Sequence, residues 1–291
     1  MRKSVSFIIS AIISILLVFL VIGETAVRCA VSFSDEKWII EIIDEKEIST
    51  KVKKSLEKNF NDKYNSTGIP ADVYMNSLSD EWVSNTVHGY ISNGMNYLSG
   101  KSDVYKFEPD FTSLNKDIEN FFIEYAEANN FEKDSVFEKK VASTQKNAVS
   151  TIKNYCDVAK MDKLYSEGIL PQARKYVIFV NKPIIEISVI ALLIILIAIL
   201  IILNRKNIEL IFYWAGSILI VSSAILLIPT IYLKATRYFD AFVIKQEQIY
   251  ITFTSLMYKA VDTVFTAAVV YAIAGIVFIA VNGIISLKKN K

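Results

Sequence analysis

Asn204-Arg205-Lys206-Asn207 is a short polar stretch between two long apolar runs, and it decides how the chain is organised. The apolar runs are residues 183–203 before it and residues 210–233 after it. Each holds about 20 residues or more, and a helix of that length, rising about 1.5 Å per residue, crosses a hydrocarbon core of about 30 Å. Because the stretch between them is so short, the sequence predicts an antiparallel transmembrane hairpin.

A third apolar run, residues 5–22, begins directly after the basic residues Arg2 and Lys3. A positive start followed by an apolar segment is typical of a signal peptide or of a signal anchor. The run is long for a cleaved signal peptide, and no clear cleavage site follows it, which favours an anchor that stays in the membrane. The fourth apolar run extends from about residue 260 to residue 287 and precedes a basic tail.

Lysine and arginine concentrate at the start of the chain, in the hairpin turn and at the C-terminal end. Membrane proteins place such residues mainly on the cytoplasmic side, and with four spans all three clusters fall on one side. We therefore expect a multi-pass protein of the cell membrane with both ends in the cytoplasm. The predicted segments are a first transmembrane helix at residues 1–23, an extracytoplasmic helical domain and stem at 24–182, the hairpin at 183–233, a short outer helical loop at 234–259, and a fourth transmembrane helix with a basic tail at 260–291.

The overall composition combines an apolar part and a charged part, because most of the 21% of charged residues lie in the segment 35–182. The net charge of +2 reflects lysine and arginine at the membrane flanks. No basic-aromatic motif of an RNA- or DNA-binding module occurs, so no nucleic-acid partner is expected. Many Lys, Ile, Asn and Ser residues, with only 9 Gly and 5 Pro, favour a bacterial genome of low GC content.

The region between the first two spans has the apolar spacing of helices. Val52, Leu56 and Phe60 recur every four residues, and Ser79 and Ser135 are placed to cap two further helices. No alternating strand pattern is found. The expected fold is an all-α integral membrane protein, with four transmembrane helices and a helical-bundle extracytoplasmic domain inserted between the first and second spans.

The predicted outer loop at residues 234–259 also keeps helical spacing, for example at Phe242, Ile249 and Phe253. We expect this loop to extend the third and fourth membrane helices and to dock on the larger domain.

Two acidic residues, Glu186 and Asp262, fall within the predicted spans. An unpaired charge costs several kcal/mol in hydrocarbon, so such residues often mark a transport path. Both lie near the outer ends of their helices, where they can reach water, and boundary positions are the simpler interpretation. The alternative is a proton or cation site shared by the two carboxylates, which would suit a small oligomeric transporter or channel.

Small residues recur at a spacing of seven in the third and fourth spans. Such spacing places them on one helix face, where two backbones can approach closely. Packing of the third span against the fourth is the simpler interpretation, and an interface with a second copy or a partner is the alternative. The predicted packing face consists of Ala215, Gly216, Ser222, Ser223, Ala267, Ala268, Ala274 and Gly275.

Cys29 and Cys156 are the only cysteines and His88 is the only histidine. Both cysteines are expected outside the cytoplasm, where they could form a disulfide; alternatively, Cys156 is a small buried apolar residue. With one histidine and two distant cysteines, no metal site is predicted, and no cofactor-binding or catalytic motif is found.

The distribution of residues predicts a non-enzymatic protein of the cell envelope. Its helical outer domain is expected to bind or sense a partner, with the four spans in the lipid bilayer as a scaffold. An accessory, assembly or sensor subunit fits this arrangement, and the partner would be another membrane or envelope protein or a second copy of the chain. The small transporter or channel using polar residues of spans two to four remains the alternative.

Overall fold

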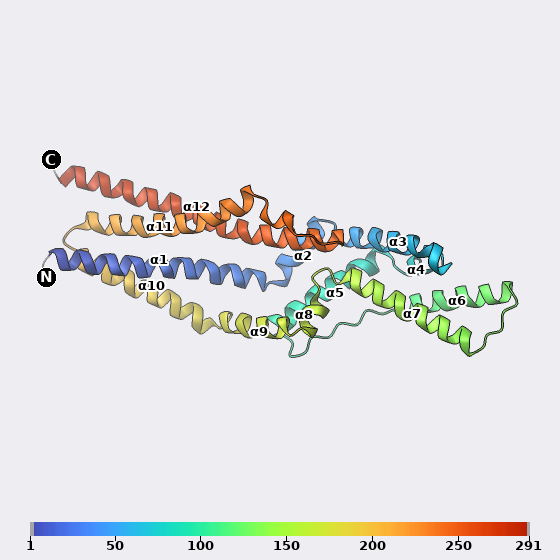
Figure 1. Ribbon diagram of the computed structural model, residues 1–291. Coiled ribbons are helices and arrows are strands. Elements are labelled where there is room, and N and C mark those ends of the chain that lie inside the picture. The colour runs from blue at the N-terminus through green and yellow to red at the C-terminus, as the bar shows by residue number, and fades with distance from the viewer. Residues whose placement is uncertain (1–2, 290–291) are drawn as a thin grey trace. The chain divides into compact units, whose positions relative to one another are not determined.

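The computed structural model describes residues 3–289, and Arg2 and Lys291, which contribute to the predicted orientation, lie outside them (Figure 1). Within the described residues the chain is entirely helical, which confirms the predicted all-α class. It divides into two compact units. The first comprises Met1–Ser34, Tyr176–Ala241 and Leu256–Lys291, and the second comprises Asp35–Lys175 and Phe242–Ser255.

Four helices are long and apolar enough to cross a membrane, as predicted. They are α1 (Lys3–Phe33), α10 (Pro183–Asn204), α11 (Ile208–Ala235) and α12 (Glu247–Lys289) (Figure 1). The hairpin turn is as short as the sequence indicates, because α10 ends at Asn204 and α11 begins at Ile208. Pro183 occupies the first turn of α10, where its missing N–H has no helical partner to lose.

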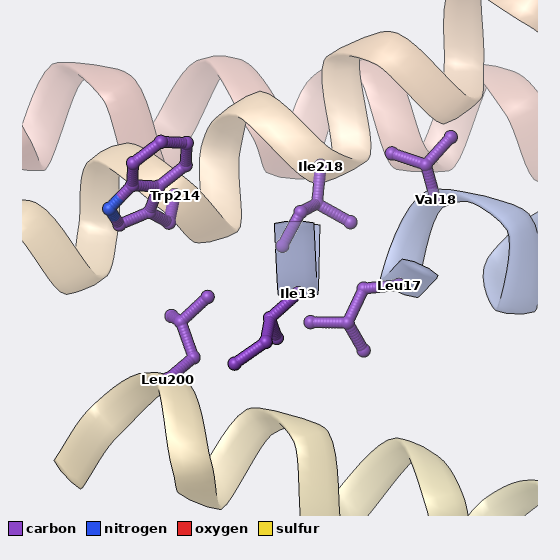
Figure 2. Packing of buried hydrophobic residues seen from close by; sticks show 6 residues of the cluster. All are labelled: Ile13, Leu17, Val18, Leu200, Trp214 and Ile218. Atoms are coloured by element: carbon purple, nitrogen blue, oxygen red, sulfur yellow. The ribbon is translucent and has the colours of Figure 1, made fainter. Parts of the chain in front are cut away.

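The core of the first unit lies where α1 packs against α10 and α11 (Figure 2). Close fit between side chains matters here, since lipid is as apolar as the side chains and gives little hydrophobic drive for helix association. The buried cluster consists of Ile13, Leu17 and Val18 of α1, Leu200 of α10, and Trp214 and Ile218 of α11.

Two of the long helices exceed the apolar runs that predict them. α1 continues past residue 22 to Phe33, and an ion pair of 2.6 Å between Glu24 and Arg28, one turn apart, lies on this extension. α12 begins at Glu247, so the predicted helical extension of the fourth span is confirmed. Its first turns belong to the second unit, with Gln248 and Thr252 buried, as expected for a segment that docks on the larger domain.

The second unit is built from shorter amphipathic helices. They are α2 (Glu36–Glu45), α3 (Ile48–Thr67), α4 (Ala71–Met75), α5 (Asp80–Leu98), α6 (Thr112–Ala128), α7 (Ser135–Cys156) and α8 (Met161–Ser166). Ser79 caps α5 as predicted, because its side chain accepts a hydrogen bond of 3.0 Å from the Trp82 amide. Gly68 ends α3 with a φ of +68°, a conformation that glycine adopts without steric cost.

One local prediction in this region needs correction. The cap of α7 is Asp134 and not Ser135, since the Asp134 carboxylate accepts hydrogen bonds from two amides of the first turn, at 2.9 and 3.0 Å. The stem, α9 (Ile169–Val180), is a separate helix, and α10 begins at Pro183. The stem ends before Pro183, because proline disfavours helical geometry in the residue that precedes it.

The core of the second unit collects the apolar stripes of α2, α3, α5, α6 and α7. Burial of each such side chain contributes about 1.5–3 kcal/mol, so a set of this size gives the unit a core of its own. Fully or almost fully buried members include Ile42 and Ile43 of α2, Val52 and Leu56 of α3, Val87, Tyr90 and Ile91 of α5, Ile118 of α6 and Ile152 of α7.

Candidate functional site

An open groove of about 830 Å³ follows α7 on the second unit. This volume lies in the range of about 300–1,000 Å³ that is usual for ligand sites. The groove is lined by Ala142, Gln145, Lys146, Val149, Ser150, Lys153 and Asn154 of α7, by Asn115 of α6, and by Asp157, Lys160, Asp162 and Lys163 at and beside α8.

One face of α7 forms the long wall of the groove. Ala142, Lys146, Val149 and Lys153 are separated by four, three and four residues, a spacing that aligns side chains along a helix. The wall therefore alternates small apolar groups with lysines. The opposite wall includes Asn115 of α6, whose backbone carbonyl accepts a hydrogen bond of 2.9 Å from a glutamine side chain of α7, so the two helices are tied at the groove.

Asp157 lines the groove and directly follows the end of α7. Its carboxylate accepts hydrogen bonds from the Met161 amide at 2.7 Å and from the Asp162 amide at 3.0 Å. These amides belong to the first turn of α8, whose N–H groups have no helical partner. The Asp157 side chain thus acts as a clamp between the end of α7 and the start of α8.

Burial changes the acidity of Asp157. Removal from water raises its pKa from 3.8 to about 6, and the nearby Asp162 carboxylate adds to the rise. The two amide hydrogen bonds and the Lys160 ammonium act in the opposite direction but do not cancel the effect of burial. The carboxyl group of Asp157 in the groove lining therefore changes charge near pH 6.

Tyrosines cover the carboxylates on the side of the core. Tyr105 donates a hydrogen bond of 2.6 Å to Asp162, and Tyr90 is fully buried with no hydrogen-bond partner for its hydroxyl among the described residues. Burial raises the pKa of both tyrosines, and the charges of Asp157 and Asp162 raise it further. Both tyrosines thus stay neutral and act as polar packing groups.

Lys160 holds the connection between α7 and α8 in place. Its ammonium donates to the backbone carbonyl of Asn154 at 2.5 Å and to the side-chain oxygen of the same residue at 2.7 Å. A longer contact of 3.4 Å reaches the side chain of Gln246, just before α12. Lys160 adopts a positive φ of 54°, and burial lowers the pKa of its ammonium. Its hydrogen-bonding capacity is used within the domain.

The two acidic residues predicted as a polar membrane site have different surroundings. Glu186 lies in the first turn of α10 with an exposed side chain. Asp262 of α12 forms an ion pair of 2.6 Å with Lys234 of α11. The ammonium of Lys234 also lies 4.6 Å from the centre of the Phe265 ring. The structure therefore gives Asp262 a lysine as its partner.

Members of the predicted packing face meet between α11 and α12. A Cβ atom added to Gly216 would lie 2.9 Å from the backbone oxygen of Gly275, and Ser223 donates a hydrogen bond of 2.8 Å to the backbone oxygen of Ala268. Ser222 is fully buried as well. The close approach agrees with packing of the third span against the fourth. Ala215, Ala267 and Ala274 are partly exposed.

Both cysteines are free thiols, Cys29 in the first unit and Cys156 in the second, so the disulfide stays a prediction. Cys156 is fully buried, and burial raises the pKa of its thiol to about 12. His88 of α5 lies 2.9 Å from a carboxylate oxygen of Asp44 on α2. Within residues 3–289 no group of three or more His, Cys, Asp or Glu side chains is placed to hold a metal ion.

The sequence pattern does not predict the groove. Its only local signal is the spacing of seven residues between Lys146 and Lys153 on the predicted helix. Asp157, in contrast, carries no local signal of burial, because its environment depends on tyrosines that are more than 50 residues away along the chain.

The fold and its four long apolar helices define the class of the molecule: it is a multi-pass membrane protein with a helical domain between its first and second spans. No protein-family model, curated protein or solved structure matches the chain.

Proposed function

We propose that the helical domain is a binding or sensing module and that the groove along α7 receives its partner. The protein would then serve as a non-enzymatic accessory, assembly or sensor subunit of the cell envelope. The observation that carries this proposal is an open groove of about 830 Å³ on a unit that has its own hydrophobic core. The partner would be another membrane or envelope protein, or a second copy of the chain.

The contacts of the spans support a scaffold role for them. Buried Asn204 and Ser10 bond to each other at 2.9 Å, and Asp262 pairs with Lys234. Polar groups that satisfy one another in this way stabilise helix association and need no transported ion.

We further propose that the helical domain lies outside the cytoplasm. The support is the basic hairpin turn at Arg205 and Lys206, since such residues are retained on the cytoplasmic side. A membrane-impermeant maleimide tests this with single cysteines introduced in a variant lacking Cys29 and Cys156. Labelling in intact cells is expected for Ser66→Cys on α3 and not for Lys206→Cys in the turn, and the reverse pattern would place the domain inside.

A photo-crosslinking amino acid placed in the groove tests the binding proposal. Position 149, normally Val149 on the groove wall, is compared with position 58, normally Lys58 on the exposed face of α3. In living cells we expect one discrete adduct from position 149 and none from position 58. Equal adduct patterns at both positions, or none at either, would contradict the proposal.

A further inference from the structure

The charges of the groove are not equally available to a ligand. Asp157 is buried and uses one carboxylate oxygen for each of two backbone amides. Asp162 accepts from Tyr105, and Lys160 is held by Asn154. Asp157 and Lys160 are occupied by contacts within the domain, so a ligand would have to displace these contacts in order to use them. Asp162 is exposed, so its carboxylate remains accessible in the groove.

Lys146 and Lys153 are different. Within residues 3–289 neither has a carboxylate within 4 Å, and Lys153 only lies over the Phe111 ring, 6.0 Å from its centre. Lys163 has a long ion pair of 3.7 Å with Glu167. Lys146 and Lys153, set against the exposed carboxylate of Asp162, leave the accessible charge of the groove positive on balance. Two lysines on one helix face, seven residues apart, are separated by about 10 Å along the helix axis.

The remaining lining indicates what kind of anion fits. Ala142 and Val149 alternate with the lysines and offer apolar contact. A matching ligand therefore carries negative charge and apolar surface together. An acidic peptide has both, and its extended backbone covers about 10 Å in three residues. A polyphosphate chain has only the charge.

From this charge pattern, we propose that the groove binds an acidic peptide segment of a partner protein, with its carboxylates on Lys146 and Lys153. The inference rests on the proposed function and adds the chemical class of the ligand. Charge-assisted hydrogen bonds to both ammonium groups would supply the specificity.

The test uses the full chain in nanodiscs of neutral phosphatidylcholine and a fluorescein-labelled oligoglutamate peptide. Binding followed by fluorescence anisotropy is expected to weaken about tenfold or more in Lys146→Gln/Lys153→Gln, because two charged contacts are lost. Glutamine keeps most of the side-chain length. The control is Lys140→Gln, a lysine on the same helix that lines a separate hollow beside α3 and is expected to leave binding unchanged.

The outcomes separate this inference from the proposed function. Absence of oligoglutamate binding, or equal loss in the control variant, overturns the acidic-peptide assignment. Polyphosphate competing as well as the peptide, with the same dependence on the two lysines, overturns it also. A discrete photo-adduct from position 149 would still support the binding function in either case, whereas its absence would remove the proposed function itself.

Discussion

Asn204 Nδ2, at the end of α10, donates a hydrogen bond of 2.9 Å to Ser10 Oγ of α1, and both side chains are buried. The same amide nitrogen donates to the Leu200 carbonyl at 2.9 Å. The Asn204 amide group thus joins the last turn of α10 to α1. It fixes which face of α1 is turned to the hairpin, and this is the face that carries Ile13 and Leu17 of the buried cluster.

Replacement of Asn204 by leucine should destabilise the membrane unit. Interhelical hydrogen bonds between membrane helices contribute about 0.6 kcal/mol on average and at most about 1.7 kcal/mol, and we expect a loss in this range. Unfolding in mixed micelles measures it. In a double-mutant cycle with Ser10→Ala, the combined loss should be smaller than the sum of the two single losses. Strict additivity would show that the two side chains do not interact.

Gly216→Ala should also destabilise the protein. The new methyl group would lie 2.8 Å from Ile279 Cγ1 and 2.9 Å from the Gly275 backbone oxygen, and the backbone cannot move aside as a side chain can. Overpacking of this kind costs about 1–3 kcal/mol. Gly283→Ala on α12 is the matched control, because nothing lies within 4 Å of its added carbon. The control should be neutral or stabilising by up to about 1 kcal/mol, owing to the better helix propensity of alanine. A similar response at both positions would contradict the tight crossing of α11 and α12.

The sequence predicts the spans well because hydrocarbon demands long apolar helices, and this signal is local. The spacing of seven also predicts the faces that carry Gly216, Ser223, Ala268 and Gly275. It does not predict which residues of the two faces meet, since this depends on the stagger of the helices. Ser10 gives no signal at all in an apolar run, because its partner lies 194 residues away.

The groove shows the same limit in the second unit. Amphipathic periodicity predicts α7, and the spacing of Lys146 and Lys153 places these two lysines on one face. Whether they line a groove depends on the placement of α6 and α8, which is set by contacts distant in the sequence, such as the one between Gln145 and Asn115. Asp134 and Ser135 are both good capping residues, so the sequence does not decide which of them caps α7. The geometry of the folded chain selects Asp134.

The ion pair between Lys234 and Asp262 should contribute little to stability. Both side chains are about half exposed, at 42% and 54%, and exposed ion pairs are worth about 0–1 kcal/mol. Lys234→Gln should therefore lower the free energy of unfolding by less than about 1 kcal/mol, and the charge exchange Lys234→Asp/Asp262→Lys should recover part of that loss. Thermal unfolding at low and high salt measures the effect, which should shrink as salt screens the pair. A loss of several kcal/mol would instead indicate that the pair is removed from water.

Asp157 should make the stability of the helical domain fall as the pH rises. Its pKa is about 6 in the folded protein and 3.8 without burial, so between these values the folded state holds a proton that the unfolded state has released. The contribution of this group to the free energy of unfolding is thus complete below pH 3.8. It is lost progressively up to pH 6, by about 3 kcal/mol in total. The melting temperature of the full chain in nanodiscs can be followed by tryptophan fluorescence. In the Asp157→Asn variant, most of its decrease between pH 4 and 6 should disappear. The variant gives up one of two amide hydrogen bonds, so it should be less stable than the wild type near pH 4, with the gap narrowing above pH 6.

Asp110 provides the control of opposite sign. Hydrogen bonds from the Thr112 side chain and amide lower the pKa of its exposed carboxylate, so its contribution is present above the ordinary pKa and is lost as the pH falls. Asp110→Asn should therefore remove a small stabilisation that grows with pH, the reverse of the effect at Asp157. If stability depended on pH between 4 and 6 in Asp157→Asn as it does in the wild type, the Asp157 carboxyl would not be the group that titrates. Its charge in the groove lining would then be constant over this range.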